Sequence, residues 1–455
     1  MTKTYTEPAR ELPVIAEVDT LVVGAGPAGC MAACAAAGEG KKVMLIENRG
    51  FVGGNLALGL PILGFLSMKG ELIIRGLSEV FVNKLRERGA CGPHRPCKQH
   101  VSLTIINPDE AKTVLLEMLE EAGVKLRLYT MFVSAIMEGN DIKGVIVESK
   151  KGREVILAKT VIDCTGDGDV AASAGVECVK GDENGGMQPP TLMFSMKGVD
   201  VDRLRAAIVN KEEGTEMDHM PQEQFREGNF ITVGMRGIMK RAEAAGLHLP
   251  VLRTILITGL ENDQIWVNMT RVNGVDSTDP DSYTNGEIVS RKQVYDVEKY
   301  LKEFVPGFEN AYIESIAPFL GIRESRVIIG KYVLTGEDLL SDRGFEDAVA
   351  VGSYPVDIHH PNGGDCTMKY CGDCYDLPYR VLVPEKVGNL LVAGRCSSMN
   401  HEAMAATRVM STCMALGHAA GTAARLAQDE NMKVADVNVK ALREQLVKEG
   451  AYLRK

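Results

Sequence analysis

Three cysteines lie close together near the C-terminal end of the sequence. Cys366, Cys371 and Cys374 have the spacing C-x4-C-x2-C, and Cys396 follows them. The cysteine ligands of plant-type iron–sulfur clusters begin with this spacing. We expect ordinary thiols in a loop and no metal. A Cys371/Cys374 dithiol and a zinc or iron–sulfur site formed by the three cysteines are the alternatives.

Two arginines flank an acid in the segment 321–326. Arg323 and Arg326 lie on either side of Glu324, at the start of an apolar run. The guanidinium fork matches the geometry of a carboxylate, so this pattern favours the binding of an anion. We therefore name Arg323 as a candidate catalytic residue, with an internal Arg–Glu ion pair as the alternative.

Three histidines and a tyrosine are candidates for proton transfer. Tyr354, His359 and His360 belong to one short segment, and His401 lies further along the chain. Imidazole titrates near neutral pH and can therefore accept or donate a proton in catalysis. Adjacent residues of a strand point to opposite faces, so at most one of His359 and His360 can face a given site. The alternatives are a polar loop for the pair and a buried, helix-capping role for His401.

The elements that must position these groups begin with a strand–helix–strand unit near the N-terminus. An apolar strand run leads into Gly24-Ala-Gly26-Pro-Ala-Gly29, a helix of small residues and a second strand that ends at Glu47. Gly24 allows the tight turn, Gly26 lets the backbone approach a pyrophosphate, and Gly29 lets helix and strand pack closely. The helix N-terminus favours the anion, and Glu47 can accept the ribose hydroxyls. The unit predicts a bound dinucleotide.

The loop after the acid, residues 48–55, carries a second glycine pair, Gly53-Gly54. This arrangement resembles the large family of two-domain flavoproteins that includes glutathione reductase, fumarate reductase and L-aspartate oxidase. In that family the loop returns the chain to the pyrophosphate. The resemblance implies that the dinucleotide is FAD.

Two segments in the middle of the chain resemble the same flavoproteins. A strand in residues 160–175 runs into Thr165-Gly166, followed by Asp169, where the resemblance implies a contact with the dinucleotide. The alternating residues 143–157 predict a hairpin with its turn at Lys150 to Gly152. The resemblance places the adenine beside this meander, and we expect the backbone of Phe132 and Val133 to contact it.

A further segment, residues 388–424, predicts a buried strand, a turn at Gly394-Arg395 and a helix from Thr407 to Ala424. In the family the turn contacts the ribityl chain, and the helix aims its N-terminus at the flavin. Arg395 stands where relatives of glutathione reductase have an acid, which places a cation near the flavin. By its position between turn and helix, His401 is the first candidate for proton transfer.

These blocks together, over residues 17–427, resemble the bacterial FAD-dependent oxidoreductase family, which is akin to the flavin part of heterodisulfide reductase. Carried over to this sequence, the resemblance implies the following cofactor-binding residues: Gly24, Gly26, Pro27, Ala28, Gly29, Glu47, Asn48, Arg49, Gly53, Gly54, Asn55, Phe132, Val133, Thr165, Gly166, Asp169, Gly394, Arg395, Thr407, Arg408 and Val409.

The predicted fold class is α/β, with a discontinuous Rossmann-like FAD-binding domain and an inserted α+β substrate domain. We expect the FAD-binding domain at residues 15–185 and 346–427, the insert at 186–345 and a helical tail at 428–455. The segment Pro280 to Glu287 is expected to be polar and turn-rich. No second G-x-G-x-x-G stands between a strand and a helix, which argues against a separate nicotinamide-binding domain.

Composition narrows the class of protein. The 455 residues carry a formal net charge of −10 and no long basic run, so we expect no nucleic-acid partner. The longest apolar stretch, Leu56 to Met68, is too short for a membrane span. Eleven cysteines without a disulfide-like spacing favour a cytoplasmic location.

The first functional hypothesis is an FAD-dependent oxidoreductase that exchanges a hydride directly with a small organic substrate. Tyr379-Arg380 and the apolar stretch 56–68 would complete its pocket wall. The alternative is an electron-transfer flavoprotein that works as one component beside an iron–sulfur or thiol partner. An RNA-modifying flavoprotein is a third hypothesis, which the net charge opposes. A redox partner protein and a homo-oligomer are both compatible with the sequence.

Overall fold

The computed structural model describes residues 3–454, so residues 1–2 and the last residue of the expected tail, 455, lie outside it. In its main sheet, four pairs of neighbouring strands run parallel to each other. β1 (Val14–Val23) lies between β2 (Val43–Ile46) and β9 (Gly152–Asp163), and β6 (Lys125–Arg127) extends the sheet beyond β2. On its other side, the end of β9 pairs in parallel with β20 (Leu390–Val392). This mixed α/β architecture with a parallel core confirms the predicted fold class.

The strand β9 has different partners along its two halves. Its first half pairs antiparallel with β8 (Asp141–Ser149), which in turn pairs with β7 (Met131–Glu138). Ser149 pairs with Gly152 across the turn, so the predicted hairpin is confirmed. Its second half pairs with β20, with Val392 opposite Asp163. A segment from the C-terminal part of the chain thereby completes the sheet.

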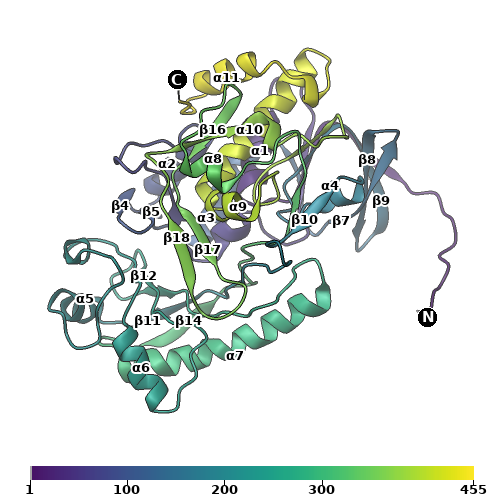
Figure 1. Ribbon diagram of the computed structural model, residues 1–455. Coiled ribbons are helices and arrows are strands. Elements are labelled where there is room, and N and C mark those ends of the chain that lie inside the picture. Colours follow the sequence, from purple (N-terminus) through teal and green to yellow (C-terminus); the bar gives the residue numbers. More distant parts are fainter. Residues whose placement is uncertain (1–2, 455) are drawn as a thin grey trace.

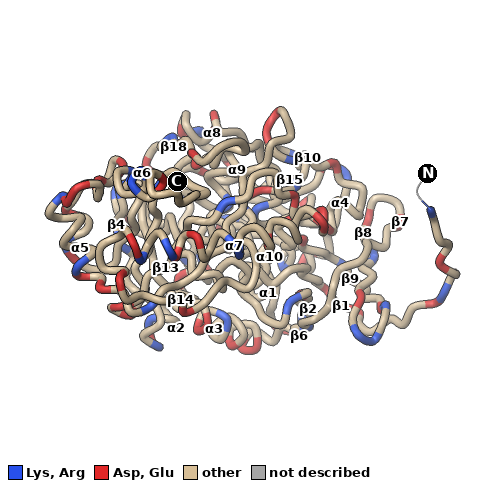
Figure 2. The backbone as a smooth tube through the Cα atoms, turned by 90° about the horizontal axis from the view of Figure 1, so that it is seen from below, with Lys and Arg blue, Asp and Glu red and all other residues tan. Residues whose placement is uncertain are grey.

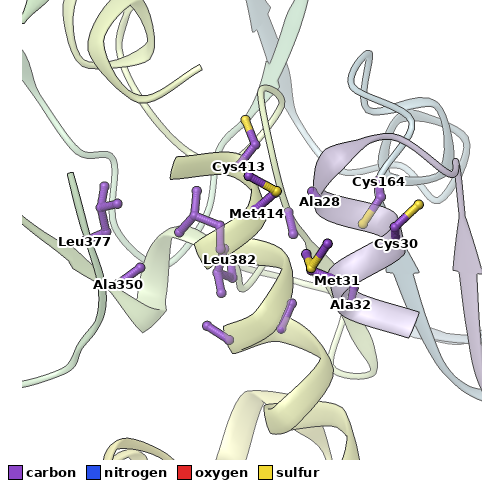
Figure 3. Packing of buried hydrophobic residues seen from close by; sticks show 14 of the residues in the cluster. Ala28, Cys30, Met31, Ala32, Cys164, Ala350, Leu377, Leu382, Cys413 and Met414 are labelled. Carbon is purple, nitrogen blue, oxygen red and sulfur yellow. The ribbon is translucent and has the colours of Figure 1, made fainter. Parts of the chain in front are cut away.

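Two helices of small residues pack tightly beneath the parallel strands. α1 (Pro27–Ala36) and α10 (Met410–Asp429) lie against each other, and Figure 3 shows Ala28 and Met31 beside Met414. A Cβ atom on Gly417 would approach the Ala28 carbonyl oxygen to 2.1 Å. A Cβ on Gly421 would lie 2.2 Å from the Ala32 carbonyl oxygen, so both glycines of α10 allow the two backbones to touch.

A second sheet lies in the middle of the chain, in the lower half of Figure 1. It is antiparallel, with the order β12 (Leu256–Thr258), β13 (Ile265–Val267), β11 (Phe194–Lys197) and β14 (Tyr312–Ile316). The accompanying helices are α5 (Val201–Val209), α6 (Arg236–Ala244) and α7 (Pro280–Phe304). The sheet and helices bury an apolar core of their own. The domain boundaries remain predictions.

The segment Pro280 to Glu287 is not a turn, contrary to the expectation. It forms the start of α7, whose N-cap Asp279 accepts hydrogen bonds from the backbone N–H groups of Asp281 and Ser282. Proline at the first helical position and acids in the first turn are typical of a helix start. The polar residues were therefore capping residues rather than loop residues.

A hairpin connects the two sheets. β17 (Val356–His359) pairs antiparallel with β18 (Cys366–Lys369), and in Figure 1 it extends from the upper part of the molecule toward the second sheet. At its tip Arg271 donates hydrogen bonds to the carbonyl oxygens of His360 and Asp365. The hydrogen bonds of Arg271 therefore hold the tip of the hairpin close to the second sheet.

The remaining elements flank these layers. They are β3 (Ile62–Leu63), α2 (Leu77–Glu87), β4 (Arg95–Cys97), β5 (Val101–Thr104), α3 (Pro108–Glu121), α4 (Asp169–Ser173), β10 (Cys178–Lys180), β15 (Arg326–Ile328), α8 (Gly336–Leu340), β16 (Ala348–Gly352), β19 (Tyr375–Pro378), α9 (His401–Thr407) and α11 (Val439–Lys448). Within residues 3–454, no helix combines the length and apolar character needed to cross a membrane. Figure 2 shows basic residues interspersed with acidic ones along the chain.

Candidate active site

The first glycine-rich turn has the geometry that a bound pyrophosphate needs. Gly24 has a φ of +96°, and a Cβ atom there would lie 2.5 Å from the Cys164 carbonyl oxygen. A Cβ on Gly29 would lie 1.8 Å from the Gly24 carbonyl oxygen. In contrast, a Cβ on Gly26 would meet no protein atom within 4 Å. Gly24 and Gly29 are needed for the fold, whereas Gly26 keeps space open beside the N-terminus of α1.

The acid at the end of β2 is held rigidly by the backbone. One carboxylate oxygen of Glu47 accepts a hydrogen bond from the Ala25 N–H at 2.8 Å, and the other accepts from the Arg49 N–H at 2.9 Å. Its side chain is buried, yet it lines the cavity beside the glycine turn. The remaining lone pairs of the carboxylate can accept hydroxyl groups of a ribose.

These residues line a cavity of about 550 Å³. The predicted cofactor-binding residues that line it are Gly24, Gly26, Pro27, Ala28, Glu47, Asn48, Arg49, Gly54, Asn55, Phe132, Thr165, Gly166, Asp169, Gly394, Arg395 and Arg408. Gly29, Gly53, Val133, Thr407 and Val409 do not line it. Gly29 is occupied with packing, and the hydroxyl of Thr407 donates to the Ala403 carbonyl oxygen inside α9.

Part of the cavity wall comes from the middle of the chain, which the motifs did not reveal. Ser277, Tyr283 and Phe319 line it from this side, and the Arg49 guanidinium lies 3.7 Å from the centre of the Phe319 ring. Such cation–aromatic contacts join segments far apart in sequence. In the sequence, only the aromatic residues Tyr283 and Phe319 mark this part of the wall, and such residues are too common to identify a site.

The predicted cation near the flavin, Arg395, is present but its charge is balanced. Its guanidinium contacts Asp167 at 2.7 Å and Ser325 at 2.6 Å, and all three residues are largely buried. Burial by itself would raise the pKa of Asp167, but the charge of Arg395 and the hydrogen bond from Ser325 outweigh it and lower that pKa. Arg395 is therefore half of an ion pair rather than a free cation.

The predicted helix from Thr407 to Ala424 is two helices. α9 ends at Thr407, and α10 begins at Met410, with Arg408 and Val409 between them. No side chain caps the first N–H groups of α10, and Met410 lines the cavity. The break turns the free N–H groups and the positive end of the helix dipole toward the cavity region.

A second, smaller cavity of about 150 Å³ adjoins the first. Five residues line both cavities: Asn55, Ile322, Arg395, Arg408 and Met410. One wall is apolar and comes from the stretch containing Leu60 and Leu63 and from β12 and its neighbours. The lining also contains polar residues, some of them from the hairpin β17–β18. A molecule in this cavity would lie next to whatever occupies the larger one.

The polar lining contains a hydrogen-bonded trio from the segment predicted to transfer protons. The Tyr354 hydroxyl donates to Asp357 Oδ2 at 2.9 Å, and His359 Nε2 lies 3.4 Å from the same oxygen. Although burial opposes it, the pKa of Asp357 is far below its usual range because of His359 and Arg408. Burial and the neighbouring Arg323 lower the pKa of His359 to about 4. At neutral pH the trio therefore holds a carboxylate and a neutral imidazole.

Two of the predicted histidines lie elsewhere. His401 lines neither cavity, because its Nδ1 binds the buried carboxylate of Glu324 at 2.7 Å. His360 also lines neither cavity and contacts the Thr367 hydroxyl at 2.9 Å. The expectation for His401 relied on its position in the chain, and a partner from a distant segment turns it away. Of the candidate catalytic residues, Arg323, Tyr354 and His359 line the second cavity.

One of the two segments predicted to form the pocket wall lines a cavity, and the other does not. Leu60, Pro61 and Leu63 of the apolar stretch line the second cavity. Tyr379 and Arg380 line neither cavity: the tyrosine hydroxyl donates to the Val434 carbonyl oxygen at 2.7 Å, and the arginine is paired with Asp347. His100 on the other hand was missed, although it lines this cavity in a stack with Tyr354.

The three clustered cysteines have separate surroundings. Cys366 lines the second cavity and accepts a hydrogen bond from Arg253 at 3.1 Å, whereas Cys374 is buried in the main core. Across residues 3–454, no three His, Cys, Asp or Glu side chains come together in a way that could hold a metal ion. Burial raises the pKa of Cys366 and of Cys371 to about 11, which keeps both as thiols at neutral pH.

A parallel sheet, a glycine turn under a helix N-terminus and a cavity lined by this turn and by the acid at the end of β2 are typical of a dinucleotide-binding flavoprotein. The family model for FAD dependent oxidoreductases matches residues 19–446, and the chain belongs to that family. It is an oxidoreductase with FAD as its cofactor.

Solved structures share the fold over nearly the whole chain. One is a geranylgeranyl bacteriochlorophyll reductase-like protein (Ta0516) from Thermoplasma acidophilum, with a TM-score of 0.50, 13% identity and coverage of 96% of this chain and 84% of that one. Another is the p-nitrophenol 4-monooxygenase PnpA from Pseudomonas putida DLL-E4, with a TM-score of 0.50, 11% identity and coverage of 95% and 84%. At these identities the likeness concerns the fold.

Proposed function

We propose that this enzyme oxidises or reduces a small organic molecule in the second cavity, by hydride transfer directly to or from FAD. The observation that carries the proposal is the shared wall of the two cavities, formed by Asn55, Ile322, Arg395, Arg408 and Met410. A cavity of about 150 Å³ admits a molecule of roughly benzene size. A substrate of this size would have its reacting carbon beside the cofactor site.

FAD, when bound, accepts or supplies the hydride. The residues expected to hold it are those of the glycine turn, Glu47 and the segment around Thr165. The chain's own contribution to the chemistry is binding and proton transfer. His359 is neutral at pH 7 and can take the proton that a hydroxylated substrate loses when it gives up a hydride. Asp357 holds the ring and stabilises the imidazolium that forms.

An anaerobic screen tests the proposal. The FAD-loaded enzyme is mixed with small hydroxylated and unsaturated compounds, and the visible flavin absorption is followed. We expect at least one hydroxylated compound to bleach it, and H359N to bleach at least about 100-fold more slowly with the same FAD content. Equal bleaching rates for H359N and the wild type would rule out the role of His359. If no compound bleaches the flavin but a protein partner reduces it, direct transfer is the wrong reaction.

A further inference from the structure

Five arginines surround the second cavity, and three of them are balanced by acids of the same chain. The pairs are Arg253 with Asp218 at 3.1 Å and with Asp365, Arg395 with Asp167 at 2.7 Å, and Arg408 with Asp357 at 3.6 Å. Each of these three guanidinium groups therefore has an acid of the same chain as its partner, although the Nε atoms of Arg253 and Arg408 make no hydrogen bond within residues 3–454.

Arg323 differs from them, because no carboxylate of residues 3–454 forms an ion pair with it. Its one hydrogen bond runs from Nη1 to the Pro189 carbonyl oxygen at 2.5 Å. Burial and the nearby charge of Arg408 lower its pKa to about 9 against the opposing effect of the Asp357 carboxylate, which is near but makes no ion pair with it, so Arg323 still carries its charge at neutral pH. Arg271, at the same cavity, also contacts only carbonyl and amide oxygens through its side chain.

Arg323 is half-buried, and an unpaired guanidinium that is partly removed from water is costly, since losing hydration without a partner opposes folding. A chain keeps such a group where something else supplies the opposite charge. The free donors of Arg323 line the second cavity, together with Tyr354 and His359. The opposite charge is therefore expected on the molecule that enters this cavity.

The rest of the cavity limits what else the molecule can be. Apolar side chains also line the cavity, among them Leu60, Leu63, Ile255 and Ile257. A molecule with a single small anionic group and an apolar body matches both kinds of lining residue. A carboxylate is the anion that pairs with the flat fork of arginine through two parallel hydrogen bonds at this size.

We infer that the substrate is a small carboxylic acid with an apolar body, bound through its carboxylate to Arg323 and through its body to the apolar wall. The inference builds on the proposed function, because it assumes that the second cavity is the substrate site. In this arrangement Arg323 binds the carboxylate of the substrate, and His359 carries out the proton transfer.

Calorimetric titration of the FAD-loaded enzyme tests the inference without turnover. The probes are isobutyrate and benzoate, each compared with its uncharged amide, isobutyramide or benzamide. Acid and amide have nearly the same shape, so a difference between them reports the charge. At pH 7 we expect at least one acid to bind about tenfold or more tightly than its amide. If both acids bind no better than the amides, or neither binds, the inference is wrong.

Two substitutions localise the effect. R323M is expected to weaken acid binding about tenfold or more while changing amide binding by less than about twofold. R323K keeps a charge without the fork and should lie between the two. The matched control is R291M, which removes an exposed arginine from the surface of α7. If R323M leaves acid binding unchanged, the carboxylate is not held by Arg323.

The outcomes separate this inference from the proposed function. Acid binding that depends on Arg323 without flavin bleaching by any acid would support the binding site and contradict direct hydride transfer. Bleaching by an uncharged compound whose rate is the same in R323M would support the reaction and overturn the substrate class.

Discussion

At the scale of single residues, Gly26 and Gly29 of the first glycine-rich turn have different roles. Gly26 has an extended backbone, with a φ of −75°, and open space where its side chain would be, so alanine fits the protein but enters the cofactor cavity. G26A should therefore fold as stably as the wild type without FAD and bind FAD about tenfold or more weakly. The measurements are FAD titration by fluorescence and thermal unfolding of the FAD-free protein.

G29A should behave in the opposite way. Its Cβ would lie 1.8 Å from the Gly24 carbonyl oxygen, so the strand and helix must move apart. We expect a loss of about 1–3 kcal/mol in the free energy of unfolding of the FAD-free protein. G344A, where a Cβ meets nothing within 4 Å, is the control. Equal stability of G29A and G344A would contradict the packing role.

The low pKa of His359 predicts an unusual pH profile. Because the pKa is about 4, the imidazole remains mostly an unprotonated base through pH 5 and 6, where a free histidine would already be mostly charged. With an oxidisable substrate, kcat/KM should stay level from pH 7 to about 5 and fall as pH drops through about 4. In H359N the remaining rate should lose that acid limb. A limb near pH 6.5 in the wild type would contradict this assignment.

The residues of the cofactor cavity were largely predictable, and those of the second cavity were not. The motifs around Gly26, Glu47 and Thr165 are local, because neighbouring residues specify the backbone turns that bring each of them to the larger cavity. The position of His401 could not be predicted, because its partner Glu324 comes from another part of the chain. His100 had no motif at all, since only the fold brings it to Tyr354.

At the scale of elements, the C-terminal helix is fastened to α10 by a carboxylate. Glu449, just after α11, accepts a hydrogen bond from Thr422, contacts His418 at 2.9 Å and pairs with Arg425. Burial opposes the charge, but His418, Gln445 and Arg425 lower the pKa of Glu449 to about 2. The charged form therefore stabilises the folded protein.

This contribution has a definite pH range. The folded pKa lies below the ordinary value, so the stabilisation is complete above about pH 4.5 and is lost as pH falls toward about 2. E449Q should be about 1–2 kcal/mol less stable than the wild type at pH 7, and the difference should shrink below pH 4. Denaturant unfolding at several pH values measures it. A difference that is constant between pH 7 and 3 would contradict the role of the charge.

The type of each helix or strand was easier to predict than its first and last residues. The strands and α1 follow from apolar runs and small residues, whereas the break at Arg408 and Val409 has no proline or glycine to announce it. α7 was missed because Asp279 and Pro280 begin helices as readily as they form turns. For α7 the signal was local and ambiguous, whereas for the break between α9 and α10 it was absent.

At the scale of the whole molecule, FAD should stabilise two regions that are far apart in the chain. The cavity is lined by the N-terminal turn and by residues such as Ser277, Tyr283 and Phe319 from the middle of the chain. On FAD binding we expect slower hydrogen exchange in residues 24–55 and also in 277–283 and 319–322. The helix α5, which lines neither cavity, is the internal reference. Protection confined to 24–55 would show that the middle of the chain does not close over the cofactor.

The position of β20 at the end of β9 has a consequence for biosynthesis. β9 cannot complete its pairing, nor α1 its packing, until residues 390–429 have left the ribosome. At about 5–20 residues per second, this delay after α1 emerges is on the order of 20–80 s. The antiparallel sheet of residues 194–316, which pairs only within itself, is complete well before then. During translation, the nascent chain would thus carry a folded middle and an unfinished nucleotide site, and FAD can be captured only after residues 390–429 have emerged.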